Sequence, residues 1–184
     1  MKKIVFPFVL ILVVGLTYMQ SGENQVEDKI IWTKSTQLEW SDFQGTPKET
    51  SGLDANTIAG IQCKPSKTKY KIGERVNYNV FAYFSKSNSW VKSGKQSEYL
   101  LKHEQIHFDI AELHARKLKT NIDQTKITVE NTRLVNDYLD EMSVQLKAMQ
   151  DQYDKETQRG EDKIAQYNWA KFVLGELGRL NELP

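Results

Sequence analysis

The sequence has almost no cysteine and no excess of charge of either sign. Cys63 is the single cysteine among 184 residues, which excludes an internal disulfide framework and any zinc finger built from several thiolates. The 25 lysines and arginines nearly cancel the 24 aspartates and glutamates. A protein whose main partner is nucleic acid needs a surplus of basic residues on one face. We therefore expect no nucleic-acid partner.

Long apolar runs are also absent, apart from one at the N-terminus. Lys2 and Lys3 precede the apolar residues 4–19, a run that suits the hydrophobic region of a signal peptide and is short for a membrane span of about twenty residues. Residues 1–21 are therefore predicted to be a signal peptide or an uncleaved N-terminal anchor, and residues 22–29 a polar tether. We expect an exported protein, periplasmic or associated with the cell envelope in a bacterium. Its contact with the membrane is expected only through an uncleaved N-terminal segment.

The first half of the remaining chain has the pattern of strands. Residues 57–64 are apolar and partly β-branched, and residues 68–72 form a shorter run of strand character. Residues 75–85 alternate apolar with polar or exposed side chains, and this period of two is typical of a half-buried strand. The Gly73-Glu74 pair predicts a turn before that strand. We therefore expect a small, mainly antiparallel sheet.

The second half has the pattern of long helices. Residues 97–121 contain no proline or glycine, and apolar side chains recur there at helical spacing. Residues 128–158 and 161–180 carry similar apolar stripes. The predicted fold is therefore α+β, with the small N-terminal sheet followed by two or three long helices in a single domain over residues 30–184.

The first of these helices contains the sequence His-Glu-Gln-Ile-His, from His103 to His107. Residues four apart lie on one face of a helix, so both imidazoles can reach one tetrahedral Zn²⁺. Glu104 is then placed to accept a proton from a zinc-activated water, as in zincin-like folds. Since the chain has only three histidines, chance occurrence of H-E-x-x-H is on the order of a few in a thousand. The alternative is a pair of histidines that face solvent or a polar core.

A catalytic zinc site needs a third protein ligand and an open fourth position. His114, the remaining histidine, lies roughly 10 Å beyond His107 along the helix axis, and no glycine between them lets the chain turn back. A role for His114 in the core is therefore favoured. We expect the third ligand to come from the second long helix. Its carboxylates all qualify on chemistry alone: Asp140, Glu141, Asp151, Asp154 and Glu156.

The helix motif and its flanks resemble a known family. Residues 100–112, with Ala115-Arg116 after them, are similar to the bacterial domain of unknown function 922, which is described as a family of candidate zinc-dependent proteases. Weaker landmarks follow the same order at residues 38–43, Trp90-Val91, residues 152–157, Gln166 and Trp169. The resemblance implies a metallopeptidase-like domain in which His103 and His107 bind Zn²⁺ and Glu104 is the general base.

The resemblance breaks at one position near the end of the second helix. The family commonly has Tyr-Asp-x-x-Thr followed two residues later by a histidine. This chain keeps Tyr153, Asp154 and Thr157, but Arg159 stands in place of that histidine. If the histidine is the usual third ligand, three outcomes stay open: Asp154 replaces it, the site binds metal weakly, or the protein is a non-catalytic relative. Tyr153 is either a hydrogen-bond donor to a transition-state oxyanion or a buried ring with a satisfied hydroxyl.

These observations predict an exported zinc-dependent metallopeptidase. A zinc-activated water would hydrolyse a peptide or protein substrate, with Glu104 as general base and then proton donor. The extended segment Val76–Phe84 is expected to bind the substrate by strand addition. The alternative, which Arg159 motivates, is a catalytically degenerate relative that binds peptide or an envelope component without cleavage.

Overall fold

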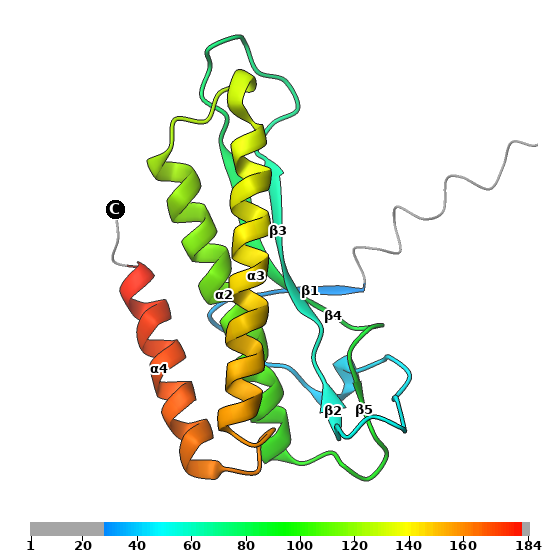
Figure 1. The fold of residues 1–184 in the computed structure, drawn as a ribbon. Coiled ribbons are helices and arrows are strands. Elements are labelled where there is room, and N and C mark those ends of the chain that lie inside the picture. Colours follow the sequence, from blue (N-terminus) through cyan, green and yellow to red (C-terminus); the bar gives the residue numbers. More distant parts are fainter. Residues whose placement is uncertain (1–27, 182–184) are drawn as a thin grey trace, which may run out of the picture.

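The structure, a computed structural model, describes residues 28–181 (Figure 1). The predicted signal peptide or anchor and most of the predicted tether lie outside the described residues. Strands come first along the chain and helices follow, which confirms the predicted α+β class. No helix between residues 28 and 181 is long and apolar enough to cross a membrane.

Three antiparallel strands form the main sheet, in the order β1 (Lys29–Ile31), β4 (Tyr78–Ser85) and β3 (Ala59–Pro65). A second, smaller sheet pairs β2 (Ala55–Asn56) with β5 (Trp90–Val91). The predicted strands over residues 57–64 and 75–85 thus correspond to β3 and β4. In β4 the predicted alternation is present, because Tyr78, Ala82 and Phe84 are buried while Asn79 is exposed.

β4 is the central strand, and its position argues against one predicted role. Phe84, which is fully buried, lies opposite both Ile30 on β1 and Ala59 on β3. β3 also pairs with β4 down to Tyr78. The segment Val76–Phe84 is therefore largely occupied by its own sheet, and it lies outside the pocket described below. The two edges of the main sheet belong to β1 and β3.

The predicted strand over residues 68–72 is absent, because these residues belong to the exposed connection between β3 and β4. Ile72 is 92% exposed, so this run has no sheet face to bury. The predicted turn is present. The N–H of Glu74 donates to the carbonyl oxygen of Lys71, and Gly73 has a φ of +73°, which glycine adopts without steric cost.

Three long helices complete the fold: α2 (Glu98–Gln124), α3 (Arg133–Glu156) and α4 (Lys163–Asn181). α2 begins as predicted, because the hydroxyl of Ser97 caps it by accepting a hydrogen bond from the N–H of Leu100. α3 begins later than residue 128, since a short 3-10 helix occupies Val129–Asn131. Another 3-10 helix, Trp40–Asp42, lies in the N-terminal region.

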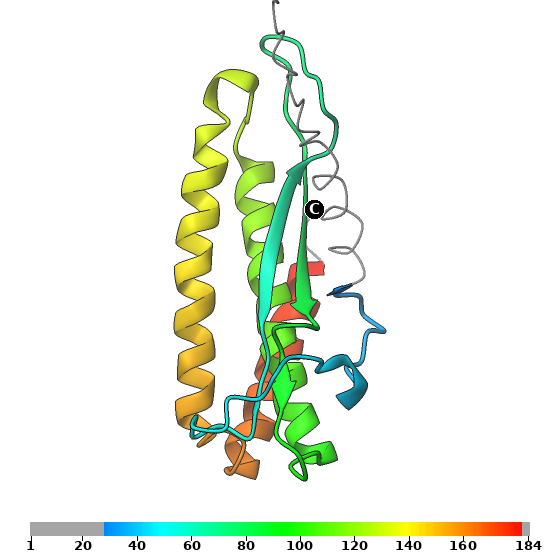
Figure 2. The same cartoon turned by 90° about the vertical axis from the view of Figure 1, so that its right-hand side faces the viewer.

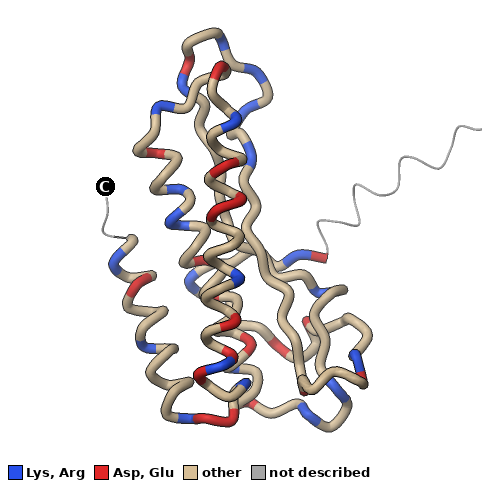
Figure 3. The backbone as a smooth tube through the Cα atoms, in the orientation of Figure 1, with Lys and Arg blue, Asp and Glu red and all other residues tan. Residues whose placement is uncertain are grey.

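α2 is the central helix, and it contacts β3 and β4 as well as α3 and α4. The helices cover one face of the main sheet (Figure 2). Phe108, Ile110 and Leu113 of α2 are fully buried, and burial of one such side chain contributes about 1.5–3 kcal/mol to folding. α2 and α3 run antiparallel, so the beginning of α2 lies beside the end of α3 (Figure 1). Charged residues of both signs are intermixed along the described chain (Figure 3).

Candidate metal centre

His103, Glu104 and His107 lie near the beginning of α2. All three residues are buried, with exposed fractions of 2%, 3% and 8%. The two histidines are about one helical turn apart, and their ring centroids lie 5.0 Å from each other. Burying two imidazoles and a carboxyl group together is costly unless they have partners. The partners of these side chains therefore decide what the site can do.

Asp154, in the last turn of α3, meets both histidines. Its Oδ1 lies 3.1 Å from Nε2 of His103 and 3.0 Å from Nε2 of His107. The ligand atoms of these three residues all lie within 4.8 Å of one another, and we call the three residues the ligand cluster. Among the described residues, no other aspartate or glutamate of α3 joins it. Asp151, for example, pairs with Lys147 instead.

The ligand cluster fits a zinc ion. Two imidazole nitrogens and one carboxylate oxygen are a ligand set that catalytic zinc sites use. Two atoms that each lie about 2.0–2.1 Å from a tetrahedral ion are about 3.3 Å apart. The two nitrogen–oxygen distances are 3.1 and 3.0 Å. Small side-chain shifts would therefore place all three atoms around one ion and leave a fourth position open.

The electrostatics of the cluster favour a cation. Burial raises the pKa of Asp154, but hydrogen bonds with His103 and His107 outweigh it and hold the pKa well below its usual range. Burial lowers the pKa of His107, but the hydrogen bond with Asp154 and the negative charge of Glu104 outweigh this effect, so that the pKa is raised. Asp154 is therefore ionised at neutral pH, and a metal ion would compete with protons for the imidazole nitrogens.

Several buried polar atoms around the site have no hydrogen-bond partner. Within residues 28–181 these atoms are Oε2 of Glu104, Nδ1 of His103, Oε1 of Gln166 and the hydroxyl of Tyr99. An unpaired buried polar atom costs about 1–3 kcal/mol. Glu104 also lines the pocket beside the two histidines. Its Oε2 therefore keeps unused hydrogen-bonding capacity beside the ligand cluster.

The turn between α3 and α4 packs against His103. Gly160 has a φ of +89°, and a Cβ on it would lie 3.4 Å from Nδ1 of His103 and 3.5 Å from Oε1 of Gln166. Glycine thus satisfies both the backbone conformation and the close approach. Neither contact could be predicted from the sequence alone. A glycine after a long helix indicates a helix end, and Gln166 was only a weak landmark.

Tyr153 is fully buried and does not line the pocket. Its ring stacks on that of His103, with centroids 4.6 Å apart and planes at 20°. Its hydroxyl donates to the carbonyl oxygen of His103 at 3.4 Å. Burial, and then the negative charges of Glu104 and Asp154, raise its pKa. This environment favours the predicted alternative of a buried ring with a satisfied hydroxyl over a donor to an oxyanion.

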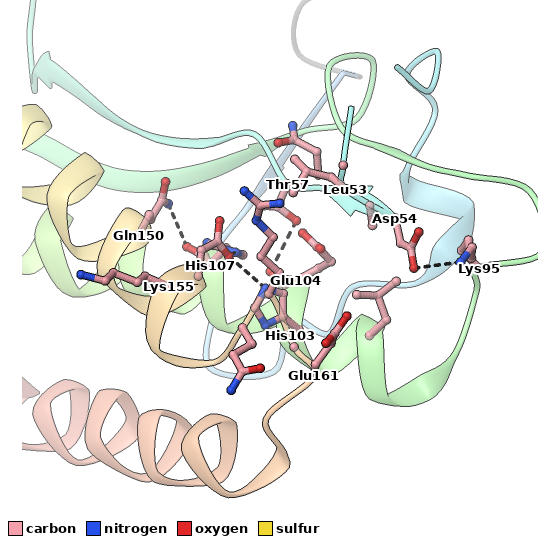
Figure 4. A pocket seen from close by; sticks show the side chains of 18 of the residues that line it. Leu53, Asp54, Thr57, Lys95, His103, Glu104, His107, Gln150, Lys155 and Glu161 are labelled. Atoms are coloured by element: carbon pink, nitrogen blue, oxygen red, sulfur yellow. Dashed lines mark hydrogen bonds and ion pairs between the residues drawn. The ribbon is translucent and has the colours of Figure 1, made fainter. Parts of the chain in front are cut away.

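A pocket of about 830 Å³ opens over the ligand cluster. It is lined by the cluster and Glu104, by residues 158–161 after α3 and by residues 52–58 around β2. Leu53 and Thr57 of that segment lie across from Glu104 (Figure 4). The hydroxyl of Thr57 donates to the carbonyl oxygen of Glu104 at 3.5 Å. The volume is within the range of pockets that bind small molecules and short peptides.

The fold and the site define an α+β protein whose central helix carries H-E-x-x-H and meets a carboxylate from the following helix. The chain belongs to the family described as bacterial protein of unknown function (DUF922), which matches residues 51–161. This match spans more than half of the chain and includes Glu104 and the whole ligand cluster. No curated protein and no solved structure matches the chain.

Proposed function

We propose that this protein is an exported zinc-dependent metallopeptidase. The observation that carries the proposal is the convergence of three ligand atoms from two helices beside a buried carboxyl group with an unpaired oxygen. The pocket over these residues has room for part of a peptide. Support for export comes from the apolar residues 4–19 that follow Lys2 and Lys3.

In this proposal the ligand cluster holds the ion and Glu104 moves the proton. Zinc, when bound, supplies a Lewis acid that lowers the pKa of a water molecule to about 7 and polarises the carbonyl group to be cleaved. The carboxylate of Glu104 would accept a proton from the attacking water and donate it to the leaving nitrogen. Tyr153 and the turn at Gly160 hold the ring of His103 between them.

The position of the peptide is suggested by the edge of the main sheet that β3 forms. Residues 55–58 line the pocket, and β3 begins at the next residue. An unpaired strand edge offers N–H and C=O groups to an extended peptide. We therefore assign strand addition to the edge of β3 instead of to Val76–Phe84.

The first test is the zinc content of the purified full-length protein, measured by elemental analysis after incubation with excess zinc and removal of unbound metal. We expect about one zinc per chain, and a loss of most of it in Asp154→Ala. Asp151→Ala is the matched control, because Asp151 lines the same pocket from the same helix but pairs with Lys147. A protein without zinc after this treatment would contradict the proposal.

Hydrolysis is measured separately with a mixed-sequence fluorogenic peptide library. We expect Glu104→Gln to keep its zinc and to lose at least about 10²-fold in kcat, because an amide cannot act as a general base. If the unchanged protein binds zinc but cleaves none of the library, the alternative is favoured. The protein would then be a degenerate relative that binds peptide or an envelope component without cleavage.

A further inference from the structure

Arg159 lies in the turn between α3 and α4 and lines the pocket beside the ligand cluster. Gln158 and Arg159 have φ values of 50° and 58°, a left-handed conformation that residues with a side chain rarely adopt. The N–H of Arg159 donates to the carbonyl oxygen of Asp154 at 2.7 Å. This hydrogen bond ties the backbone of Arg159 to the residue that contacts both histidines.

The side chain of Arg159 reaches across the pocket. Its Nη1 lies 3.4 Å from the position that a Cβ on Gly52 would occupy, and Gly52 lines the pocket from the segment around β2. Arg159 itself is exposed, so solvent and solutes can reach its N–H groups. The guanidinium group therefore lies where a molecule bound over the ligand cluster would meet it.

The other charges in the pocket leave Arg159 available. Lys95 pairs with Asp54 at 3.1 Å and Lys147 pairs with Asp151 at 2.6 Å, so two of the pocket's basic side chains are already neutralised. Over residues 28–181, Arg159 takes part in no ion pair of this kind. A planar guanidinium has five N–H donors in a fork that matches the two oxygens of a carboxylate.

We propose that Arg159 binds a carboxylate of the substrate, so that the preferred substrates are peptides with a free carboxylate near the cleaved bond. This carboxylate belongs either to the C-terminus of the peptide or to an aspartate or glutamate side chain, which present the same group. The role of the peptide as a substrate rests on the proposed function. The binding of a carboxylate by Arg159 does not.

The test compares the dissociation constants of three N-acetylated pentapeptides, measured by calorimetry on the full-length Glu104→Gln protein so that no peptide is consumed. The peptides are pentaalanine with a free C-terminus, its C-terminal amide, and the amide with glutamate at the central position. We expect one of the two acidic peptides to bind at least about tenfold more tightly than the neutral amide. The tighter of the two identifies the source of the carboxylate.

Variants at Arg159 then test whether this side chain causes the tighter binding of the acidic peptide. Arg159→Gln should abolish it and Arg159→Lys should reduce it. Lys155→Gln, which removes another exposed basic side chain lining the same pocket, should preserve it. Melting temperatures show whether each variant is folded. Equal binding of the three peptides, a preference that survives Arg159→Gln, or one that is equally lost in Lys155→Gln would overturn the inference.

The same series in zinc-free buffer separates this inference from the proposed function. A preference for the acidic peptide that depends on Arg159 without zinc supports the carboxylate site even if the protein never binds zinc. If the protein binds zinc but has no such preference, the zinc site at the ligand cluster is supported and carboxylate binding by Arg159 is refuted.

Discussion

The two halves of α2 bury histidines in different ways. In the first half, His103 and His107 meet the carboxylate of Asp154 beside a pocket. In the second half, His114 is just as buried, at 2% exposed, but its Nδ1 lies 2.8 Å from the carbonyl oxygen of Ile110 one turn earlier. Burial of a histidine is therefore no evidence for a metal site. The partner of the imidazole makes the difference.

The pKa values of His107 and His114 shift in opposite directions. Burial lowers the pKa of His114, and the hydrogen bond with Ile110 only partly opposes this shift. At His107 the effect of burial is reversed by Asp154 and Glu104. The second half of the helix therefore holds a neutral imidazole in the core, and the first half holds the imidazole of His107 in surroundings that favour positive charge.

Two glutamates of α2 also differ between the two halves of the helix. Glu112, in the second half of α2, pairs with Arg116 at 2.8 Å and so is held within the fold. Glu104, in the first half, has an unpaired Oε2. Groups that serve stability are satisfied inside the protein, whereas groups at the candidate site keep unused bonding capacity.

The largest expected effect is on zinc affinity, and it is tested with two variants that each remove one histidine, one from each half of α2. His103→Ala should lower zinc affinity by more than about a hundredfold, because it removes a direct ligand and not merely an outer partner. His114→Ala should leave zinc affinity unchanged while it lowers the free energy of unfolding by roughly 1–3 kcal/mol. Competition with a chromophoric chelator measures the first quantity and urea unfolding the second. Similar losses of zinc affinity in both variants would end the distinction between the halves.

A smaller effect is expected at Gln166. If His103 bound metal through Nε2, its Nδ1 would carry a proton, and Oε1 of Gln166, which has no hydrogen-bond partner, lies against the same glycine, Gly160. Gln166→Leu should therefore weaken zinc binding by about ten- to a hundredfold. Gln166→Glu keeps an acceptor and should retain most of the affinity in the same chelator assay. Equal losses in both variants would show that Gln166 acts only by packing.

The smallest effect is in the pH dependence of stability. The folded pKa of His114 lies below its ordinary value of 6.5, so the unfolded chain binds the proton more readily. The contribution of His114 to the free energy of unfolding is fully present above pH 6.5. It is lost as the pH falls below that value, by at most about 1.4 kcal/mol per pH unit. Urea unfolding of the zinc-free protein at pH 7.5 and 5.5 should show less acid destabilisation in His114→Gln. An unchanged acid sensitivity would contradict this assignment.

Local patterns predicted most of the fold. The helix expected over residues 97–121 is present as α2, because its apolar spacing and its cap are properties of the local sequence. The strand expected over residues 68–72 failed for a physical reason. Its strand-like residues lie in a loop beyond the sheet, where β propensity has no neighbouring strand to act on. The type of most elements could be read from the local sequence, whereas whether a strand-like run finds a neighbouring strand could not.

The candidate site, too, could be predicted from the local sequence only in part. Two residues of the ligand cluster lie one helical turn apart, so the sequence could place His103 and His107 together. The third depends on how α3 crosses α2, and five carboxylates on that helix were equal on chemistry until the structure brought Asp154 to the histidines. The contact of Gly160 with His103 also comes from tertiary packing, which leaves no local pattern. The roles of these residues in zinc binding and catalysis stay predictions.

The ligand cluster lies at the open end of a helical hairpin. Residues 125–132 join α2 and α3 at the far end (Figure 1), while His107 and Asp154, 47 positions apart in the chain, meet at the other end. An ion held between them would act as a removable cross-link. Because it would bind the folded chain preferentially, it would add stability in proportion to the logarithm of its concentration. The lifetime of the protein would then follow the supply of metal in its compartment.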